Sequence, residues 1–376
     1  MPDPTSRIVP LLSDLVAIDS RSFVSNLPIA ERVENALAGF AIERLDYTDP
    51  QGVAKRSLVA HRGPLGGGPG GVALSAHMDT VPDTGWQEDP FSARLDEKGV
   101  LHGLGATDLK GPLAAIIVAA TELSPSVPVS LLISADEETT KEGARVIAAR
   151  SALVREANPA AIVVAEPTRL KPVRGHRSHI EFTAIATGEA AHSSTGRGRN
   201  ANWELLPFLN RMHEIFLRLR RDPALQDAAY DPPFSDFNLI LDNHGSAINV
   251  TVPKATARIK YRYSAGIDPE PLVGEVREAA EHAGLALTIA REGDPPELSP
   301  DHPLIRLAVE ITGEAPSTAP YGTDASELQG IAPCVVLGPG DIAVAHRPGE
   351  SVRIADLAAA VPVFMRLAER LAAGGW

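Results

Sequence analysis

GVALSAH, residues 71–77, is a short apolar run that ends in a histidine, and two runs of the same kind follow it, VPVSLLISA (127–135) and AAIVVAE (160–166). Apolar runs of this length are typical of strands buried on both faces of a sheet. KGPLAAIIVAATEL (110–123) and KEGARVIAARSALV (141–154) carry helical patterns. The alternation of strand and helix predicts a mostly parallel or mixed sheet with helices on its faces.

A different pattern begins after about Pro172. In several segments apolar and polar residues alternate one by one, which is typical of half-exposed antiparallel strands. These segments are HIEFTAIATG (179–188), FNLILDN (237–243) and ATARIKYRYS (255–264). Helical patterns at 201–221 and near 269–283 separate them. We therefore expect a two-layer α+β arrangement, a small sheet with two helices on one side.

The α/β pattern returns from His302, with a strand at PCVVLGP (333–339) and a final helix from Ile354. A chain of 376 residues is also long for one ordinary core. We predict an α/β fold with a mixed-sheet domain in two parts and an inserted, smaller α+β domain. The expected boundaries are 1–175 and 293–376 for the two parts, and 176–292 for the inserted domain.

Composition narrows the class of protein. The formal net charge of −13 disfavours a nucleic-acid partner, since such proteins usually carry a basic face. The single cysteine, Cys334, excludes an intrachain disulfide, and its apolar surroundings predict a buried thiol. No apolar stretch has the length of a membrane span, and the segment MPDPTSRIVPLLSDLVAIDS lacks the pattern of a secretion leader. We expect a cytoplasmic protein with no membrane partner.

Metal-type ligands follow the predicted strands or lie in adjacent loops, where open α/β sheets build their sites. They are His77-Met78-Asp79, Asp108, Asp136-Glu137-Glu138, Glu166 and His346. Each signal is weak alone, since an isolated histidine is usually structural and a carboxylate after a strand often caps a helix. Together, imidazoles and carboxylates without a thiolate suit zinc, cobalt or manganese. Two histidines with three carboxylates match two metal ions that share a bridging carboxylate.

The remaining acids of these segments fit supporting roles. Asp79 lies two residues beyond His77, so on a strand both side chains point to the same face, and the carboxylate is placed to orient the imidazole. A hydrolysis also needs a base that removes a proton from water and delivers it to the leaving group. Glu137, beside the ligand-type Glu138, is the natural candidate.

Five segments in order also resemble a known family. They are SAHMDTVP (75–82), GLGATDLKG (103–111), SADEE (134–138), AEPT (165–168) and LGPGDIAVAH (337–346). They are similar to the zinc amidohydrolases and metallopeptidases that include acetylornithine deacetylase, succinyl-diaminopimelate desuccinylase, aminoacylases and glutamate carboxypeptidase. The resemblance covers nearly the whole chain, and AEPT and GPGDIAVAH look closest to the acetylornithine deacetylase group.

The resemblance implies a role for each ligand-type residue. His77 and Glu166 would hold one zinc ion, Glu138 and His346 a second, and Asp108 would bridge the two. The resemblance also implies that cobalt can substitute for zinc. Asp79 would orient His77, and Glu137 would be the general acid and base.

The resemblance also implies that the inserted domain forms a homodimer and contributes to the site. GEAAHSSTG (188–196) is similar to the family segment whose histidine stabilises the tetrahedral oxyanion, often in the partner's site, which singles out His192. A surface turn histidine is the alternative. Asn249 and Arg262 match positions that contact the substrate, and an arginine suits bidentate binding of a carboxylate. The alternative for Arg262 is the solvated face of an alternating strand.

The segment Gly322-Thr323-Asp324 matches a further family segment near the site, with a plain turn as the alternative, and Gly322 and Thr323 are the expected substrate contacts. The expected function is hydrolysis of the amide bond of an N-acylated amino acid, N-acetyl-ornithine or a close relative, in amino-acid and arginine biosynthesis. A desuccinylase and a carboxypeptidase of the same family are the alternatives. A catalytically silent protein that binds an amino-acid derivative is an alternative of another class, and the complete ligand set with Glu137 argues against it.

Overall fold

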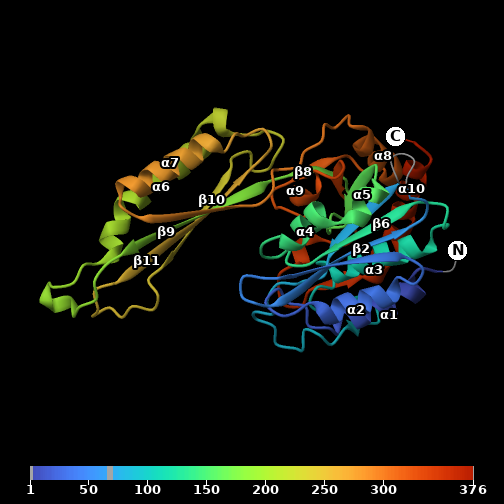
Figure 1. The fold of residues 1–376 in the computed structure, drawn as a ribbon, viewed down its shortest axis with the longest axis horizontal. Coiled ribbons are helices and arrows are strands. Elements are labelled where there is room, and N and C mark those ends of the chain that lie inside the picture. The colour runs from blue at the N-terminus through green and yellow to red at the C-terminus, as the bar shows by residue number, and fades with distance from the viewer. Residues whose placement is uncertain (1–2, 66–70, 376) are drawn as a thin grey trace. The chain divides into compact units, whose positions relative to one another are not determined.

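The computed structural model describes residues 3–65 and 71–375, so residues 66–70 of the glycine-rich segment at 62–71 lie outside the described residues. The chain forms two compact units. The first unit comprises Met1–Gly175, Pro296–Ser317 and Thr323–Trp376, and the second comprises His176–Pro295 and Thr318–Gly322. The predicted fold class is confirmed, because a mixed-sheet α/β unit is accompanied by a smaller α+β unit (Figure 1).

The first unit is built on an eight-stranded sheet. In spatial order the strands are β1 (Ala41–Thr48), β2 (Ala54–Arg62), β6 (Val129–Ser134), β3 (Val72–His77), β7 (Ala161–Val164), β14 (Cys334–Val336), β8 (Val173–His176) and β13 (Ser317–Ala319). β6, β3, β7 and β14 run parallel to one another, whereas β2 pairs antiparallel with β1 and β6, and β8 antiparallel with β14. The sheet is therefore mixed, with a parallel centre.

The parallel strands are buried from end to end. Every residue of β3, β6 and β7 is buried, which explains why their sequences are continuous apolar runs without alternation. The buried strand β14 includes Cys334, whose thiol is buried as predicted. Because the four strands run in parallel, the residues that follow them meet at one edge of the sheet.

Helices cover both faces of this sheet. α1 (Thr5–Val16), α3 (Lys110–Glu122) and α10 (Ile354–Ala372) pack on one another, and α3 and α10 pack on β3. α2 (Leu27–Ala36) packs against α1, and α8 (Pro303–Thr312) against α10. α3 is buried on all sides over its first eleven residues, as expected for a helix that is apolar all round.

The second layer of helices is α4 (Glu142–Arg150), α5 (Ala152–Ala157) and α9 (Ala325–Leu328), which pack on β2, β6 and β14 (Figure 1). The single helix predicted over 141–154 is wrong. Ser151 interrupts it with extended backbone, and its hydroxyl accepts a hydrogen bond from the N–H of Val154 at 3.0 Å to begin α5. The Glu43 carboxylate accepts from the N–H groups of Ala152 and Leu153, so it stabilises the same helix start.

A three-stranded sheet lies apart from the large one. Its strands are β15 (Ser351–Arg353), β5 (Val100–His102) and β4 (Arg94–Leu95), in that order. β15 leads directly into α10, so this sheet fixes the start of the last helix.

The second unit is a four-stranded antiparallel sheet with two helices. The strands, in spatial order, are β10 (Asp236–Asp242), β11 (Lys254–Tyr263), β9 (Ser178–Thr187) and β12 (Ala286–Arg291). α6 (Ala201–Arg221) packs on β9 and β11, and α7 (Glu270–His282) on β12. Buried and part-buried residues alternate along β9, which confirms the predicted half-exposed strand.

Short 3-10 turns complete the two units: η1 (Ser193–Thr195), η2 (Pro223–Leu225) and η3 (Ile342–Val344). Within residues 3–65 and 71–375, no helix combines the length and the apolar character that a membrane crossing requires.

Candidate functional site

The ligand-type residues gather at the carboxyl edge of the parallel strands. His77 is the last residue of β3, the turn with Glu137 and Glu138 follows β6, and Glu166 follows β7. His346 follows β14 and η3. Asp108 comes from the loop before α3, where the Asp108–Leu109 peptide bond is cis.

Asp108 lies between the two histidines. Its Oδ1 is 3.1 Å from His77 Nε2, and its Oδ2 is 3.2 Å from His346 Nε2. Glu166 Oε1 is 4.0 Å from His77 Nε2, whereas Glu138 Oε1 is 3.1 Å from His346 Nε2. The five side chains therefore divide into two groups that share Asp108, one with His77 and Glu166 and the other with His346 and Glu138.

The histidine rings are oriented for binding through Nε2. His77 Nδ1 lies 3.0 Å from the backbone carbonyl oxygen of Asp79, which can only accept, so Nδ1 carries the proton and Nε2 faces Asp108. His346 presents Nε2 to two carboxylates and stands in a left-handed backbone conformation with φ 58°. Non-glycine residues in this conformation are uncommon and are enriched at functional sites.

The surroundings compensate the charge of two of the carboxylates, Glu138 and Glu166, only in part. Burial, and then the charge of Asp108, raise the pKa of Glu138 to about 8 and hold the pKa of Glu166 well above its ordinary value. Hydrogen bonds to Asp108 and Glu138 raise the pKa of His346 to about 11. Although burial opposes it, bonding to Asp108 also raises the pKa of His77.

This donor set fits divalent metal ions. One donor atom each from His77, Asp108 and Glu138 lie within 4.8 Å of one another, and all are imidazole nitrogen or carboxylate oxygen. A divalent cation would stabilise the ionised carboxylates and the neutral imidazoles together. Asp108, which offers one oxygen to each group, suits a carboxylate between two such ions.

Asp79 holds the turn that carries Glu137 and Glu138. Its Oδ1 accepts the N–H of Glu137 and its Oδ2 the N–H of Glu138, both at 3.1 Å, and the Ser22 hydroxyl donates to Oδ2 at 2.8 Å. Its Oδ1 is also 3.5 Å from His77 Nδ1. The sequence predicted that Asp79 orients the histidine, but most of its hydrogen bonds go to the backbone of the turn.

A buried ion pair stabilises the same turn at Asp136, the residue that precedes Glu137. Lys55 Nζ lies 2.8 Å from Asp136 Oδ1, and the Tyr47 hydroxyl donates to Asp136 Oδ2 at 2.8 Å. Asp136 has φ 60°, and this left-handed residue directs the chain sharply from β6 into Glu137. Lys55 also donates to the backbone carbonyls of Ser22 and Val24, so it ties the loop after α1 to the turn.

Glu350 performs the equivalent task for the loop of Asp108. Its buried carboxylate accepts from the N–H groups of Gly105, Thr107 and Asp108 at 2.8–3.0 Å. Burial, and then the charge of Asp108, raise the pKa of Glu350 to about 7. Sequence reasoning assigned Glu350 no role, because its partners lie more than 240 residues away in the chain.

Glu137 lies near two further charged groups, Lys141, which sequence reasoning missed, and Asp324. Its Oε1 is 3.8 Å from Lys141 Nζ, and the buried Asp324 acts on it electrostatically. Burial raises the pKa of Glu137, with Lys141 and His77 opposing the shift. Burial and the charge of Glu137 raise the pKa of Asp324 to about 7. Asp324 belongs to the segment Gly322-Thr323-Asp324 that resembles a family segment near the site, but sequence reasoning gave it no role of its own.

The other predicted substrate-binding residues are mostly in the second unit. His192 is exposed at the start of η1, and the N–H of Ser193 donates to the Asn249 carbonyl at 3.0 Å, which brings their two loops together. Arg262, on β11, lies 3.3 Å from Asp236. Gly322 is part-buried at the end of the second unit.

Thr323, in the first unit, is buried and its hydroxyl accepts from the N–H of Ala325 at the start of α9.

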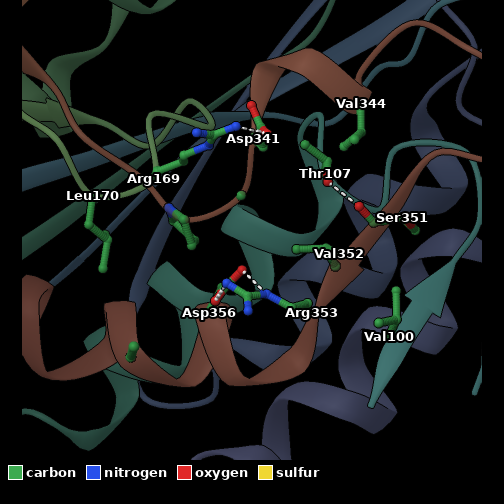
Figure 2. A pocket seen from close by; sticks show the side chains of 13 residues that line it. Val100, Thr107, Arg169, Leu170, Asp341, Val344, Ser351, Val352, Arg353 and Asp356 are labelled. Atoms are coloured by element: carbon green, nitrogen blue, oxygen red, sulfur yellow. Dashed lines mark hydrogen bonds and ion pairs between the residues drawn. The ribbon is translucent and has the colours of Figure 1, made fainter. Parts of the chain in front are cut away.

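Two cavities lie near the cluster in the first unit. The larger, of about 600 Å³, is lined by residues such as Thr107, Val344 and Val352 and by two ion pairs, Arg169 with Asp341 and Arg353 with Asp356 (Figure 2). None of the five ligand-type side chains lines it, and each arginine has a carboxylate partner. The smaller, of about 360 Å³, is lined by Glu138 and therefore opens onto the cluster.

Comparison with known proteins shows the family of the chain. Residues 73–370 match the model of the family described as "Peptidase family M20/M25/M40". An acetylornithine deacetylase of Myxococcus xanthus is 32% identical over 389 residues, which cover 100% of both chains.

Solved structures share the fold. A di-peptidase of Saccharomyces cerevisiae has a TM-score of 0.73 at 16% identity, over 99% of this chain and 98% of its own. A dinuclear metal binding peptidase of the M20 family from Bacillus subtilis has a TM-score of 0.64 at 17% identity, over 98% of this chain and 99% of its own. The chain therefore belongs to the peptidase family M20/M25/M40, and it is a metal-dependent hydrolase of amide bonds.

Proposed function

We propose that this hydrolase removes the acyl group from an N-acylated amino acid, and that N-acetyl-ornithine or a close relative is its substrate. The main structural support for this proposal is the Asp108 carboxylate, which faces His77 with one oxygen and His346 with the other. The relative named acetylornithine deacetylase, which matches the whole chain, supports the acetylated substrate. We place the reaction in amino-acid biosynthesis, specifically that of arginine, in the cytoplasm.

We propose that the cluster holds two zinc ions, for which cobalt can substitute. His77 and Glu166 would bind one ion, His346 and Glu138 the other, and Asp108 both. Such ions polarise the carbonyl of the substrate and lower the pKa of water. The grouping of distances around Asp108 supports this assignment.

Glu137 is the proposed general base and acid. Its buried carboxyl has a raised pKa, which suits a group that accepts a proton from water and then donates it to the leaving amine. Asp79 fixes the backbone of Glu137 through a hydrogen bond of 3.1 Å, so the carboxyl is held in position before the substrate binds. The ammonium of Lys141, 3.8 Å away, opposes the rise in the pKa of Glu137 and so favours its ionised form.

The second unit supplies the proposed contacts to the rest of the substrate. His192 would stabilise the oxyanion of the tetrahedral intermediate, and Arg262 and Asn249 would bind the free α-carboxylate. Gly322 and Thr323 would line the site. The side chain of Arg262 is about one-third exposed and pairs with Asp236 at 3.3 Å, so its guanidinium retains donors for a carboxylate.

We further propose a homodimer formed through the inserted domain of residues 176–292. β10 is an edge strand of its sheet, and its Leu239, Ile240 and Leu241 are 43%, 50% and 55% exposed. Ile248, in the loop after β10, is fully exposed. An edge strand with apolar side chains is a template for pairing with another chain, and a second copy would bury it.

Replacement of the base is the first test. Glu137→Gln keeps the shape but cannot accept a proton, so we expect kcat to fall about 10²–10⁴-fold while the metal content is unchanged. Glu138→Gln should lose metal instead. The exposed neighbour Glu142, which pairs with Arg145, offers the control Glu142→Gln, which should retain the wild-type rate. A near wild-type kcat in Glu137→Gln contradicts the assignment.

The substrate class is tested by a ratio of kcat/KM values, because discrimination depends on differential binding of the transition state. N-acetyl-ornithine should outperform N-succinyl-diaminopimelate, and ornithine derivatives with an amidated α-carboxyl should be poor substrates. Preference for the succinylated compound, or for removal of a C-terminal glutamate, would move the protein to another branch of the family.

Action across the dimer is tested by mixing two inactive variants. His192→Ala and Glu137→Gln proteins should each be nearly inactive alone. If His192 serves the partner's site, subunit exchange creates dimers with one site that contains both wild-type residues, and activity should return. Absence of recovery in a demonstrably mixed dimer rejects action between subunits.

A further inference from the structure

The smaller cavity of the first unit is formed by four loops and opens beside Glu138. Its walls come from the loop after α1, the turn between β1 and β2, the segment after β3 and the turn after β6. Its volume of about 360 Å³ lies at the lower end of the range of small-molecule sites, so it has room for the side chain of an amino acid. Glu138 is also a proposed metal ligand. A substrate whose amide bond lies at the metal centre would therefore extend a substituent into this cavity.

One wall of this cavity is apolar and fixed in position. Phe23, Val81 and Pro82 form it, and Phe23 is 54% exposed in the protein alone. The Arg21 guanidinium lies 4.9 Å from the centre of the Phe23 ring and is itself anchored by Asp19 and Asp83, each at 2.6 Å. An exposed aromatic ring held beside a catalytic centre is suited to cover the methylene groups of a bound substrate.

The charged groups that line the cavity are all acidic. They are Asp49, Asp136 and Glu138, and none of the described lining residues is a lysine, arginine or histidine. Asp136 is neutralised by Lys55 at 2.8 Å, and Glu138 belongs to the metal cluster. Of these three carboxylates, that of Asp49 has no cationic partner among the described residues.

Asp49 is also rigidly placed. Its Oδ1 accepts from the N–H groups of Gln51 and Val53 at 2.9 and 2.8 Å, which closes the turn between β1 and β2. The described hydrogen bonds leave Oδ2 open to another donor. A carboxylate fixed in this way loses little conformational entropy when it binds a cation.

We propose that this cavity binds the side chain of the substrate amino acid, and that it selects an aliphatic chain ending in an ammonium group. The methylenes lie against Phe23, Val81 and Pro82, and the ammonium donates to Asp49. An anionic group in the cavity meets carboxylates without a compensating cation, so succinyl or glutamyl groups are disfavoured there. The proposal rests on the proposed function and adds the part of the site that chooses the side chain.

The test compares two acetylated substrates that differ only in the terminal ammonium, N-acetyl-ornithine and N-acetyl-norvaline. Asp49→Asn keeps an oxygen for the turn but loses the charge. We expect the ratio of their kcat/KM values to fall about 10-fold or more in Asp49→Asn, because a hydrogen bond to a charged group is lost. Gln51→Lys, at an exposed residue lining the same cavity, should also lower the ratio.

The chain offers a matched control in Asp96. Its Oδ1 accepts from the N–H groups of Lys98 and Val100, both at 2.9 Å, in a turn of the same pattern, and it lies outside the cavity. Asp96→Asn should leave the ratio at its wild-type value. An unchanged ratio in Asp49→Asn and Gln51→Lys overturns the proposal, as does a change in the preference between N-acetyl and N-succinyl ornithine alone, which would assign the cavity to the acyl group. If the wild-type enzyme loaded with zinc hydrolyses neither acetylated compound, the proposed function fails first.

Discussion

The carboxylates of Asp108, Glu138 and Glu166 are concentrated at one buried edge of the sheet, and the rest of the first unit depends on keeping this charge there. Burial of several carboxylates costs free energy unless cations or hydrogen-bond donors compensate them. The four parallel strands bring the residues to one edge because their carboxyl ends coincide. The raised pKa values of Glu138 and Glu166 indicate that the protein alone leaves the charge partly uncompensated, which is the condition that a site for divalent cations requires.

Three buried side chains hold the loops of this edge in place. Asp79 accepts from the backbone of Glu137 and Glu138, Glu350 accepts from the loop of Asp108, and Lys55 pairs with Asp136. Each joins segments that are far apart in the chain, so the loops are fixed by tertiary contacts rather than by their own sequences. Since proton transfer requires a base within hydrogen-bond distance of water, such support is as necessary as the ligands themselves.

Sequence patterns predicted the elements whose burial is uniform. The apolar runs of β3, β6 and β7 and the all-round apolar α3 are recognisable because one environment surrounds the whole element. Patterns failed where a single side chain changes the backbone, as at Ser151, which separates α4 from α5 although the helical pattern continues through it.

In the candidate site, too, some residues could be predicted from the sequence and others could not. Ligand-type residues after buried strands were visible as a set, because chemistry and position along the chain coincide at His77, Glu138 and Glu166. Lys55 was not visible, since a solvated face is the ordinary interpretation of a lysine on a strand next to the edge of a sheet. Glu350 and Asp324 were noted only as parts of segments that resemble the family, without a role of their own. Only the folded chain shows that each is buried against a functional segment.

We propose that Asp108 is shared by two metal ions, and the mechanism depends on this shared carboxylate. The most direct measurement is calorimetric titration of the metal-free protein with zinc, with the rate of hydrolysis of N-acetyl-ornithine followed on the same samples. Two ions should bind per chain, and the metal-free protein should be inactive. Full activity without metal, or saturation of both binding and activity at one ion per chain, would contradict the account.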